Sequence, residues 1–229
     1  PIHGFIYRSE TEQKIIDTKI FQRLRGIRQL AMANLGYPGA LHTRFEHSIG
    51  TMHIASRMAK QFLLDQDRER LVRLAALLHD IGHGPFSHIS EYALSNYYDK
   101  SKMGEIATEK IHEKITQQII QEDEALSHLI SDSDREKIVN LLAGKGISLE
   151  RQIVSGPLDA DKQDYLLRDS YFCGVKYGVY DIERLINTLQ VYSEKHDEFL
   201  AASKDGIHAI EQFVLAKYYM QTQVYRHKI

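Results

Sequence analysis

Three histidines and one carboxylate fall within ten residues in the stretch from Leu78 to His88, which reads L-H-D-I-G-H-G-P-F-S-H. Imidazole nitrogens and carboxylate oxygens are ligands that divalent metals take in proteins. The run before it, from Leu71 to Leu78, is apolar on more than one face and predicts a buried helix. His79 and Asp80 would then lie inside the protein. A buried carboxylate needs a cation or a hydrogen-bonding network. For a lone His-Asp pair, a hydrogen-bonded core histidine beside a solvated aspartate would be the simpler interpretation.

Two other stretches favour a metal. His47 stands at the start of a second helical pattern, in the sequence H-T-R-F-E-H-S that begins at His42. Asp161 lies in P-L-D-A-D-K-Q-D-Y, which packs three acids around a lysine and continues as an amphipathic helix. Together His47, His79, Asp80 and Asp161 would form a mixed nitrogen and oxygen site. Such a site suits Mn, Fe, Mg or Zn and does not choose among them.

Helices are the elements that must position these residues. Ser9 and Glu12 form the S-x-x-E pattern of a capping box, which predicts that a helix begins there. Further helical patterns cover residues 104–121, the segment after Asp161, residues 181–190 and the end of the chain. Gly84-Pro85 is expected to stop one helix and start the next. A small β-hairpin is predicted near residues 191–202, with a turn at 203–206. The predicted fold class is therefore all-α with one hairpin.

Composition narrows the classes of protein. The chain has 229 residues, of which 43% are hydrophobic, and no linker or repeat divides it, so a single domain over 1–229 is expected. The formal charge of -2, with acids and bases interspersed, gives no basic face for nucleic acid. No membrane span or signal peptide is visible. Cys173 is the single cysteine, so a disulfide framework is excluded and a cytoplasmic location is expected.

The order His47, His79-Asp80, Asp161 resembles that of the HD-domain metal phosphohydrolases. The resemblance is closest to the deoxynucleoside triphosphate triphosphohydrolases, and its motifs span nearly the whole chain in that family's order. They are P-I-H-G from Pro1, F-Q-R-L-R from Phe21, R-F-E-H-S from Arg44, H-D-I-G-H-G-P-F-S-H from His79, D-K-Q-D-Y from Asp161 and Y-R-H-K from Tyr225. This resemblance implies a mostly helical HD-domain bundle in which the four side chains hold a divalent metal ion.

The resemblance also implies catalytic residues. His112 aligns with a catalytic histidine and Glu91 with its acidic partner, although an exposed helix histidine is usually inert. A histidine of near-neutral pKa can protonate a leaving oxygen. His88 and His112 are both candidates, and the sequence does not choose between them. His83 and Glu91 would orient or tune them.

Eight residues are expected to bind substrate. Arg44 comes three residues before His47, and a planar guanidinium there would grip phosphate oxygens. By resemblance, Gln29 and Leu30 touch the deoxyribose and help to exclude a 2′-hydroxyl, while Lys162 binds phosphate. The other four are Tyr165 on the sugar and base, Asp169 on the 3′-hydroxyl, and Lys217 and Tyr225 on the phosphates and sugar. At the position that matches Lys217, the vertebrate member of that family has arginine. Lysine keeps the charge but lacks the two-pronged guanidinium that binds phosphate oxygens bidentately.

An effector site is a further expectation. Asp17, Gln22 and Arg25 match residues that read a guanine nucleotide at a subunit interface in regulated family members, and otherwise they are ordinary solvated helix residues. His227 and Lys228 resemble a pair at the same interface. GTP or dGTP would be the effector, and a homo-oligomer, dimer or tetramer, would be the assembly. Members of the family extend further, so native N-terminal residues and a C-terminal lobe are expected outside the quoted sequence.

The expected reaction is hydrolysis of a dNTP to deoxynucleoside and inorganic triphosphate, with a divalent metal activating water for attack on the α phosphorus. One alternative is an HD phosphohydrolase for a nucleotide monophosphate, an alarmone or a cyclic nucleotide. Another is a nucleotide-sensing module without turnover. A zinc metalloprotease fits poorly because H-D-x-x-H lacks the glutamate base, and Ser87-His88 lacks a G-x-S-x-G elbow.

Overall fold

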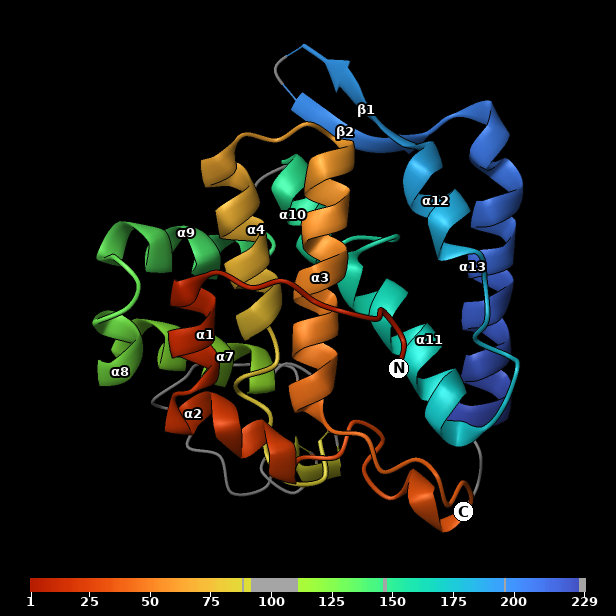
Figure 1. The fold of residues 1–229 in the computed structure, drawn as a ribbon, viewed down its shortest axis with the longest axis horizontal. Helices are drawn as coiled ribbons and strands as arrows, with labels where there is room; N and C mark the ends of the chain where they lie inside the picture. The colour runs from red at the N-terminus through yellow and green to blue at the C-terminus, as the bar shows by residue number, and fades with distance from the viewer. Residues whose placement is uncertain (88, 92–110, 146–147, 196, 227–229) are drawn as a thin grey trace.

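The computed structural model describes residues 1–87, 89–91, 111–145, 148–195 and 197–226. Within these ranges the chain is mostly helical, and its two strands form an antiparallel hairpin (Figure 1). The predicted fold class, all-α with a small hairpin, is confirmed. None of the helices in these ranges combines the length and the apolar character that a membrane span requires.

The N-terminal region contains two short helices where the sequence predicted one start. Helix α1 (Glu10–Ile16) begins at the predicted capping box, in which Ser9 and Glu12 each accept a hydrogen bond from the backbone of the other. Thr18 interrupts the helix, because its hydroxyl donates to the carbonyl of Ile15 and caps α2 (Lys19–Gln22). The chain then tightens into the 3₁₀ turn η1 (Arg23–Gly26). A second 3₁₀ turn, η2 (Ala33–Leu35), follows before the central helices.

Three helices form the centre of the molecule. Helix α3 (Arg44–Gln61) packs against α4 (Gln66–Leu78) on one side and α11 (Ala160–Cys173) on the other (Figure 1). The apolar end of α4 is buried, as predicted, so the chain leaves the helix inside the protein. The predicted stop at Gly84-Pro85 is wrong. Helix α4 already ends at Leu78, with His79 as its C-cap and turns at the residues that follow.

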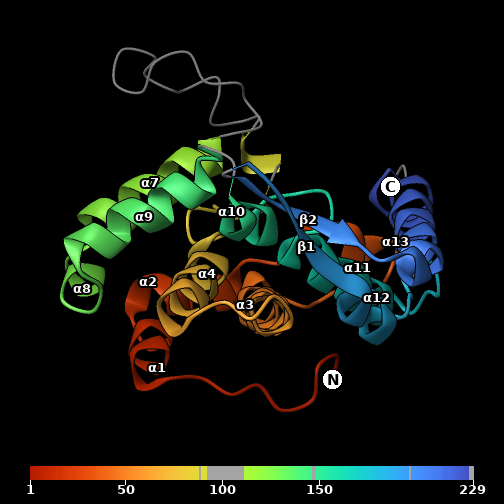
Figure 2. The ribbon, with the colours of Figure 1, turned by 90° about the horizontal axis from the view of Figure 1, so that it is seen from above.

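Four further helices cover the other side of α4. They are α7 (Ile111–Glu122), α8 (Glu124–Ser127), α9 (Asp132–Leu142) and α10 (Leu149–Val154). Figure 2 shows α7 and α9 lying side by side, and both α9 and α10 pack on α4. Their buried side chains Ile120, Ile138 and Ile153 belong to the main core. Residues 104–110 of the helix predicted over 104–121 lie outside the described residues.

The C-terminal part forms a second apolar cluster with α11. It comprises α12 (Ile182–Thr188), β1 (Leu189–Glu194), β2 (Asp197–Ala202), the 3₁₀ turn η4 (Lys204–Gly206), α13 (Ile207–Met220) and a π-helical turn, η5 (Gln221–Tyr225). The hairpin pairs Val191 with Leu200, within the predicted region. Leu166 of α11 and Phe213 of α13 are fully buried in this cluster. The packing brings Tyr225, the last residue of η5, back to α11, where its hydroxyl donates to Asp169.

Candidate metal centre and adjoining pocket

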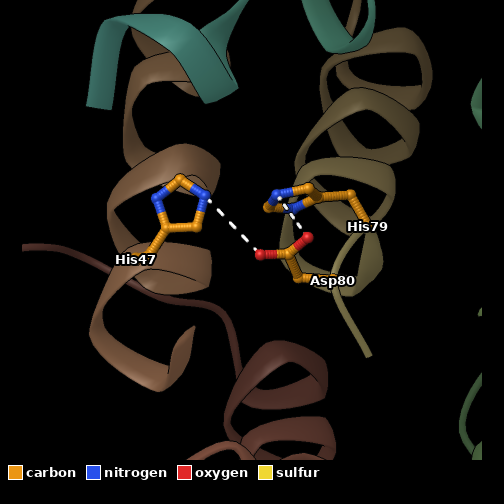
Figure 3. A group of neighbouring side chains, drawn as sticks. All are labelled: His47, His79 and Asp80. Atoms are coloured by element: carbon orange, nitrogen blue, oxygen red, sulfur yellow. Dashed lines mark ion pairs between the residues drawn. The ribbon is translucent and has the colours of Figure 1, made fainter. Parts of the chain in front are cut away.

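The four predicted ligands come from three elements and meet between the central helices. His47 lies in the first turns of α3, His79 and Asp80 follow the end of α4, and Asp161 lies in the first turn of α11. His47 Nε2 lies 2.9 Å from Asp161 Oδ1 and 3.7 Å from Asp80 Oδ2. His79 Nε2 lies 3.4 Å from Asp80 Oδ1 and 3.6 Å from Asp161 Oδ1. Figure 3 shows the two imidazoles on either side of the Asp80 carboxylate.

Both imidazoles present the right atom for a metal. His47 Nδ1 lies 2.7 Å from Asp164 Oδ2, and His79 Nδ1 lies 2.7 Å from the carbonyl of Ala76. Because these oxygens only accept, each Nδ1 must carry the proton, which leaves the lone pair of each neutral ring on Nε2. Within the described residues both Nε2 atoms are buried without a hydrogen-bond partner. Two buried lone pairs between two carboxylates fit a divalent cation with mixed nitrogen and oxygen ligands.

The electrostatics of the centre favour positive charge. Burial alone would lower the pKa of His47, but hydrogen bonds and charges from Asp161 and Asp164 outweigh it and raise that pKa to about 10. Burial would raise the pKa of Asp161, yet His47 and His79 hold it well below its usual range. The carboxylates therefore stay ionised, so a positive charge, either a metal ion or a proton, is needed between them and the two Nε2 atoms. Asp161, with 32% of its side chain exposed, opens the centre toward solvent.

Arg44 joins the centre to the loop after the H-D motif. It is the first residue of α3 and is buried, and its guanidinium donates to Asp80 Oδ2 and, over 2.9 Å, to Ser87 Oγ. Ser87 itself donates to the carbonyl of Arg28. Phe86 and Ser87 both have positive φ angles, of 64° and 50°, which side-chain-bearing residues rarely adopt. The strained loop thus directs Ser87 at Arg44.

The predicted catalytic residues lie beside the metal centre. Glu91 is buried and hydrogen-bonds to His112 Nδ1, and the His112 ring stacks on that of His83 with centroids 3.9 Å apart. His83 Nε2 in turn lies 3.3 Å from Asp80 Oδ1. Burial lowers the pKa of His83 to about 3, more than the charge of Asp80 raises it. The structure therefore brings His83, Glu91 and His112 together, whereas His88 lies outside the described residues.

A pocket of about 630 Å³ adjoins the centre, with Arg44 in its wall. Its lining includes six of the eight predicted substrate residues: Gln29, Leu30, Arg44, Tyr165, Asp169 and Tyr225. Both oxygens of Asp169 are held in place, one 2.6 Å from His42 Nε2 and the other accepting from the hydroxyl of Tyr225 over 2.8 Å. Aromatic faces beside fixed polar groups and one cation suit a nucleoside with a phosphate chain. The substrate-binding roles of these six residues stay predictions.

Two predicted phosphate ligands do not line this pocket. The ammonium group of Lys162 bonds to Asp159 Oδ2 at 2.6 Å, one turn earlier on the chain. Burial, followed by the charge of Asp161, raises the pKa of Asp159 to about 6. Lys217 is exposed on α13. Their assignment as phosphate ligands also stays a prediction.

The predicted effector residues that the structure describes lie together on another face. Asp17, Gln22 and Arg25 line a hollow of about 240 Å³, which Phe45 also lines. The guanidinium carbon of Arg25 lies 3.5 Å from the centroid of the Phe45 ring, and Arg25 Nε donates to the Gln22 side chain. His227 and Lys228 lie outside the described residues.

The sequence reasoning missed several residues that hold the site. Asp164, which bonds His47, follows Asp161 by three residues in the same helix, and that spacing was the available signal. His42, which bonds Asp169, lies in the stretch that leads to His47. Ser87 gave no signal, because its role depends on a loop conformation.

Comparisons with known proteins agree with this geometry. A family model described as HD domain matches residues 44–169, which include all four candidate ligands. A crystal structure of a hypothetical protein from Aquifex aeolicus superposes with a TM-score of 0.84 at 40% identity, and the match covers 100% of this chain and 59% of that one.

Curated relatives match over nearly the entire chain. An uncharacterized protein of Methanocaldococcus jannaschii is 40% identical over 99% of this chain and 45% of its own length. The deoxynucleoside triphosphate triphosphohydrolase SAMHD1 homolog of Dictyostelium discoideum is 34% identical over 100% of this chain and 45% of its own length. The chain spans about half the length of the curated relatives it matches.

Proposed function

Because the chain belongs to the HD domain family, we propose that it is a metal-dependent phosphohydrolase that cleaves dNTPs to deoxynucleoside and inorganic triphosphate. The four ligands of the proposed centre are His47, His79, Asp80 and Asp161. A divalent ion held by them supplies Lewis-acid activation of water and of a phosphoryl oxygen. Mg, Mn, Fe and Zn all suit this donor set.

One observation carries the proposal: Arg44 contacts both the centre and the pocket. Its guanidinium donates to Asp80, a candidate ligand, and the same residue lines the 630 Å³ pocket. A triphosphate with its α phosphorus at the metal centre would lie next to the guanidinium of Arg44. Arg44 can then offset charge that develops on the phosphoryl oxygens during attack. Ser87, which accepts from Arg44 Nε, would keep the guanidinium in place.

The residues that line the pocket support the proposed substrate class. Tyr165 and Tyr225 supply aromatic faces whose centroids are 6.0 Å apart, and Asp169 lies between polar partners. We assign Asp169 and Tyr225 to the sugar, and Gln29 and Leu30 to the face that would exclude a 2′-hydroxyl. The dNTP assignment is also supported by the similarity to the Dictyostelium relative, which is named a deoxynucleoside triphosphate triphosphohydrolase homolog.

The reaction needs one proton transfer to the substrate. Attack by water on the α phosphorus breaks its bond to the 5′-oxygen, which must be protonated as it leaves. Among the described residues His112 is the candidate acid. Glu91 holds its Nδ1 and so orients the ring, and Nε2 is the atom assigned to deliver the proton. The His83 ring stacks on the His112 ring and so limits its rotation.

Activation by GTP or dGTP, in a homodimer or homotetramer, is part of the proposal. The hollow lined by Asp17, Gln22 and Arg25 combines a carboxylate, an amide and a guanidinium, which suits the polar edge of guanine. Rates with a second dNTP as substrate should rise when GTP is added to the full-length protein. Equal rates with and without GTP would remove this part of the proposal.

Product analysis tests the function. Each dNTP is incubated with metal-depleted full-length protein plus Mg²⁺, Mn²⁺ or Fe²⁺. After the metal is removed, phosphorus NMR identifies the phosphate product and liquid chromatography quantifies the nucleoside. The proposal predicts triphosphate and deoxynucleoside in equal amounts, and none after chelation. Pyrophosphate or orthophosphate would indicate another phosphohydrolase. Nucleotide binding without turnover in any metal would indicate a sensing module.

A further inference from the structure

Asp164 is a buried carboxylate that hydrogen-bonds to a candidate metal ligand, although it is not one of the four candidate ligands itself. It is fully buried on α11. Oδ2 lies 2.7 Å from His47 Nδ1, and Oδ1 lies 2.6 Å from His3 Nε2. Arg168, one turn later on α11, donates from Nε and Nη2 at 2.8 Å to the two oxygens. Four hydrogen bonds thus hold the Asp164 side chain. Two of them come from His47 and His3, which lie 117 and 161 residues away in the sequence.

Asp164 fixes the tautomer of His47. Arg168 donates to both oxygens of Asp164, a pairing that suits the carboxylate form. A carboxylate only accepts, so His47 Nδ1 must donate to it. The lone pair of His47 is therefore directed from Nε2 toward Asp80 and Asp161.

The backbone is shaped to admit this pair. A Cβ atom on Gly50, one turn after His47 on α3, would lie 2.0 Å from Asp164 Oδ1 and 2.4 Å from Arg168 Nη2. Only a glycine there leaves room for the buried ion pair against the helix that carries His47. His3 closes the other side of Asp164, with 3% of its side chain exposed.

We infer, on the basis of the proposed metal-dependent function, that Asp164 is the positioning residue for His47 and that Arg168 and His3 hold it in place. Carboxylates behind a ligand histidine fix ring orientation and raise ligand basicity, and their loss costs about 10–100-fold in metal affinity or activity. Arg168 keeps the carboxylate ionised, because a buried guanidinium pairs with both oxygens. His3 ties the first residues of the chain to the metal centre.

Replacing Asp164 with asparagine tests this role. An asparagine can turn its amide nitrogen toward His47 and so favour the other tautomer, with the proton on Nε2. We expect Asp164→Asn to bind Mn²⁺ about 10–100-fold more weakly in titrations followed by Mn²⁺ electron spin resonance. Those titrations contain no nucleotide. In turnover at saturating Mn²⁺, kcat should fall while KM for the dNTP changes little.

Glu12→Gln is the matched control. Glu12 is also buried, and Arg73 donates to both of its oxygens at 2.6 Å, in an ion pair that joins α1 to α4 and, in the described part of the chain, has no hydrogen bond to a candidate ligand. The two variants lose the same charge from the same kind of ion pair. Glu12→Gln should lower the unfolding temperature yet keep the Mn²⁺ affinity of the wild type. Equal Mn²⁺ affinity in Asp164→Asn and the wild type would overturn the inference.

His3 gives a gentler variant, because it precedes the first helix. His3→Ala should weaken Mn²⁺ binding in the same direction by less, and His3→Gln, whose amide can still donate to Asp164, should recover most of the affinity. If Asp164→Asn fails to fold, the two His3 variants test the inference instead. Equal Mn²⁺ affinities in His3→Ala, His3→Gln and the wild type would then overturn it. A wild type that binds none of Mn²⁺, Fe²⁺ and Zn²⁺ would overturn the proposed function itself.

Discussion

Gly50 lies so close to Asp164 that a Cβ atom on the glycine would meet the carboxylate oxygen at 2.0 Å. Gly50→Ala must therefore displace α11 from α3 or break the contact of Asp164 with Arg168. Overpacking of this kind typically costs about 1–3 kcal/mol of stability. We expect a lower midpoint in urea unfolding and weaker Mn²⁺ binding.

Gly26→Ala is the control for this change. A Cβ there would have no neighbour within 4 Å, and Gly26 lies in η1 rather than on α3 or α11. Its urea midpoint and Mn²⁺ affinity should match those of the wild type. Equal urea midpoints and equal Mn²⁺ affinities in the two alanine variants would show that the tight contact between α3 and α11 governs neither stability nor metal binding.

Tyr225→Phe tests the sugar end of the pocket. The change removes the hydroxyl that donates to Asp169 Oδ2, while His42 still bonds the other oxygen. A hydrogen bond of this type contributes about 1 kcal/mol, so KM for a dNTP should rise about five-fold. Steady-state kinetics measure the effect. Tyr192→Phe, on the exposed face of the hairpin, should leave KM unchanged, and an unchanged KM in Tyr225→Phe would place the sugar elsewhere.

The ion pair of Glu12 and Arg73 predicts a pH dependence of stability. Burial would raise the pKa of Glu12, but hydrogen bonds from Arg73 and Ser9 outweigh it and lower the pKa below its ordinary value of 4.5. A lowered pKa in the folded state means that the pair stabilises fully above pH 4.5 and that this contribution fades as the pH falls further.

Urea unfolding between about pH 7 and pH 3 measures this contribution. Wild type should exceed Glu12→Gln in stability at neutral pH, and the difference should shrink in acid. Arg73→Ala, which leaves Glu12 buried and unpaired, should cost about 3–5 kcal/mol at neutral pH. A difference between wild type and Glu12→Gln that stays constant with pH would contradict the lowered pKa.

Local signals in the sequence predicted much of the fold. The capping box of Ser9 and Glu12, the apolar end of α4 and the turn signal at 203–206 each depend on a few adjacent residues. The predicted end of α4 was wrong because the helix stops at Leu78, where a turn begins at His79, before the chain reaches Gly84. Such turns form where tertiary contacts outweigh the helix propensity of the residues.

The candidate ligands were predictable because their chemistry is unusual at these spacings, whereas their supports were not. Asp164 contacts His3 across 161 positions, a pairing that follows only from the course of the N-terminal segment past α3 to α11 (Figure 1). Ser87 reaches Arg44 through a backbone with positive φ, for which its sequence gives no glycine signal. For Lys162 the resemblance implied phosphate binding, which stays a prediction, while its contact with Asp159 follows from the helix turn.

Metal content of the purified protein tests the central claim most directly. Wild type, His79→Ala and Asp161→Ala are loaded with Mn²⁺ or Fe²⁺, passed through gel filtration and assayed for bound metal, with circular dichroism as the check on folding. His128→Ala, at an exposed histidine after α8, is the control. We predict bound metal in the wild type and the control, and its loss from the two ligand variants at unchanged helicity. Equal metal content in all four proteins would contradict the assignment of the centre.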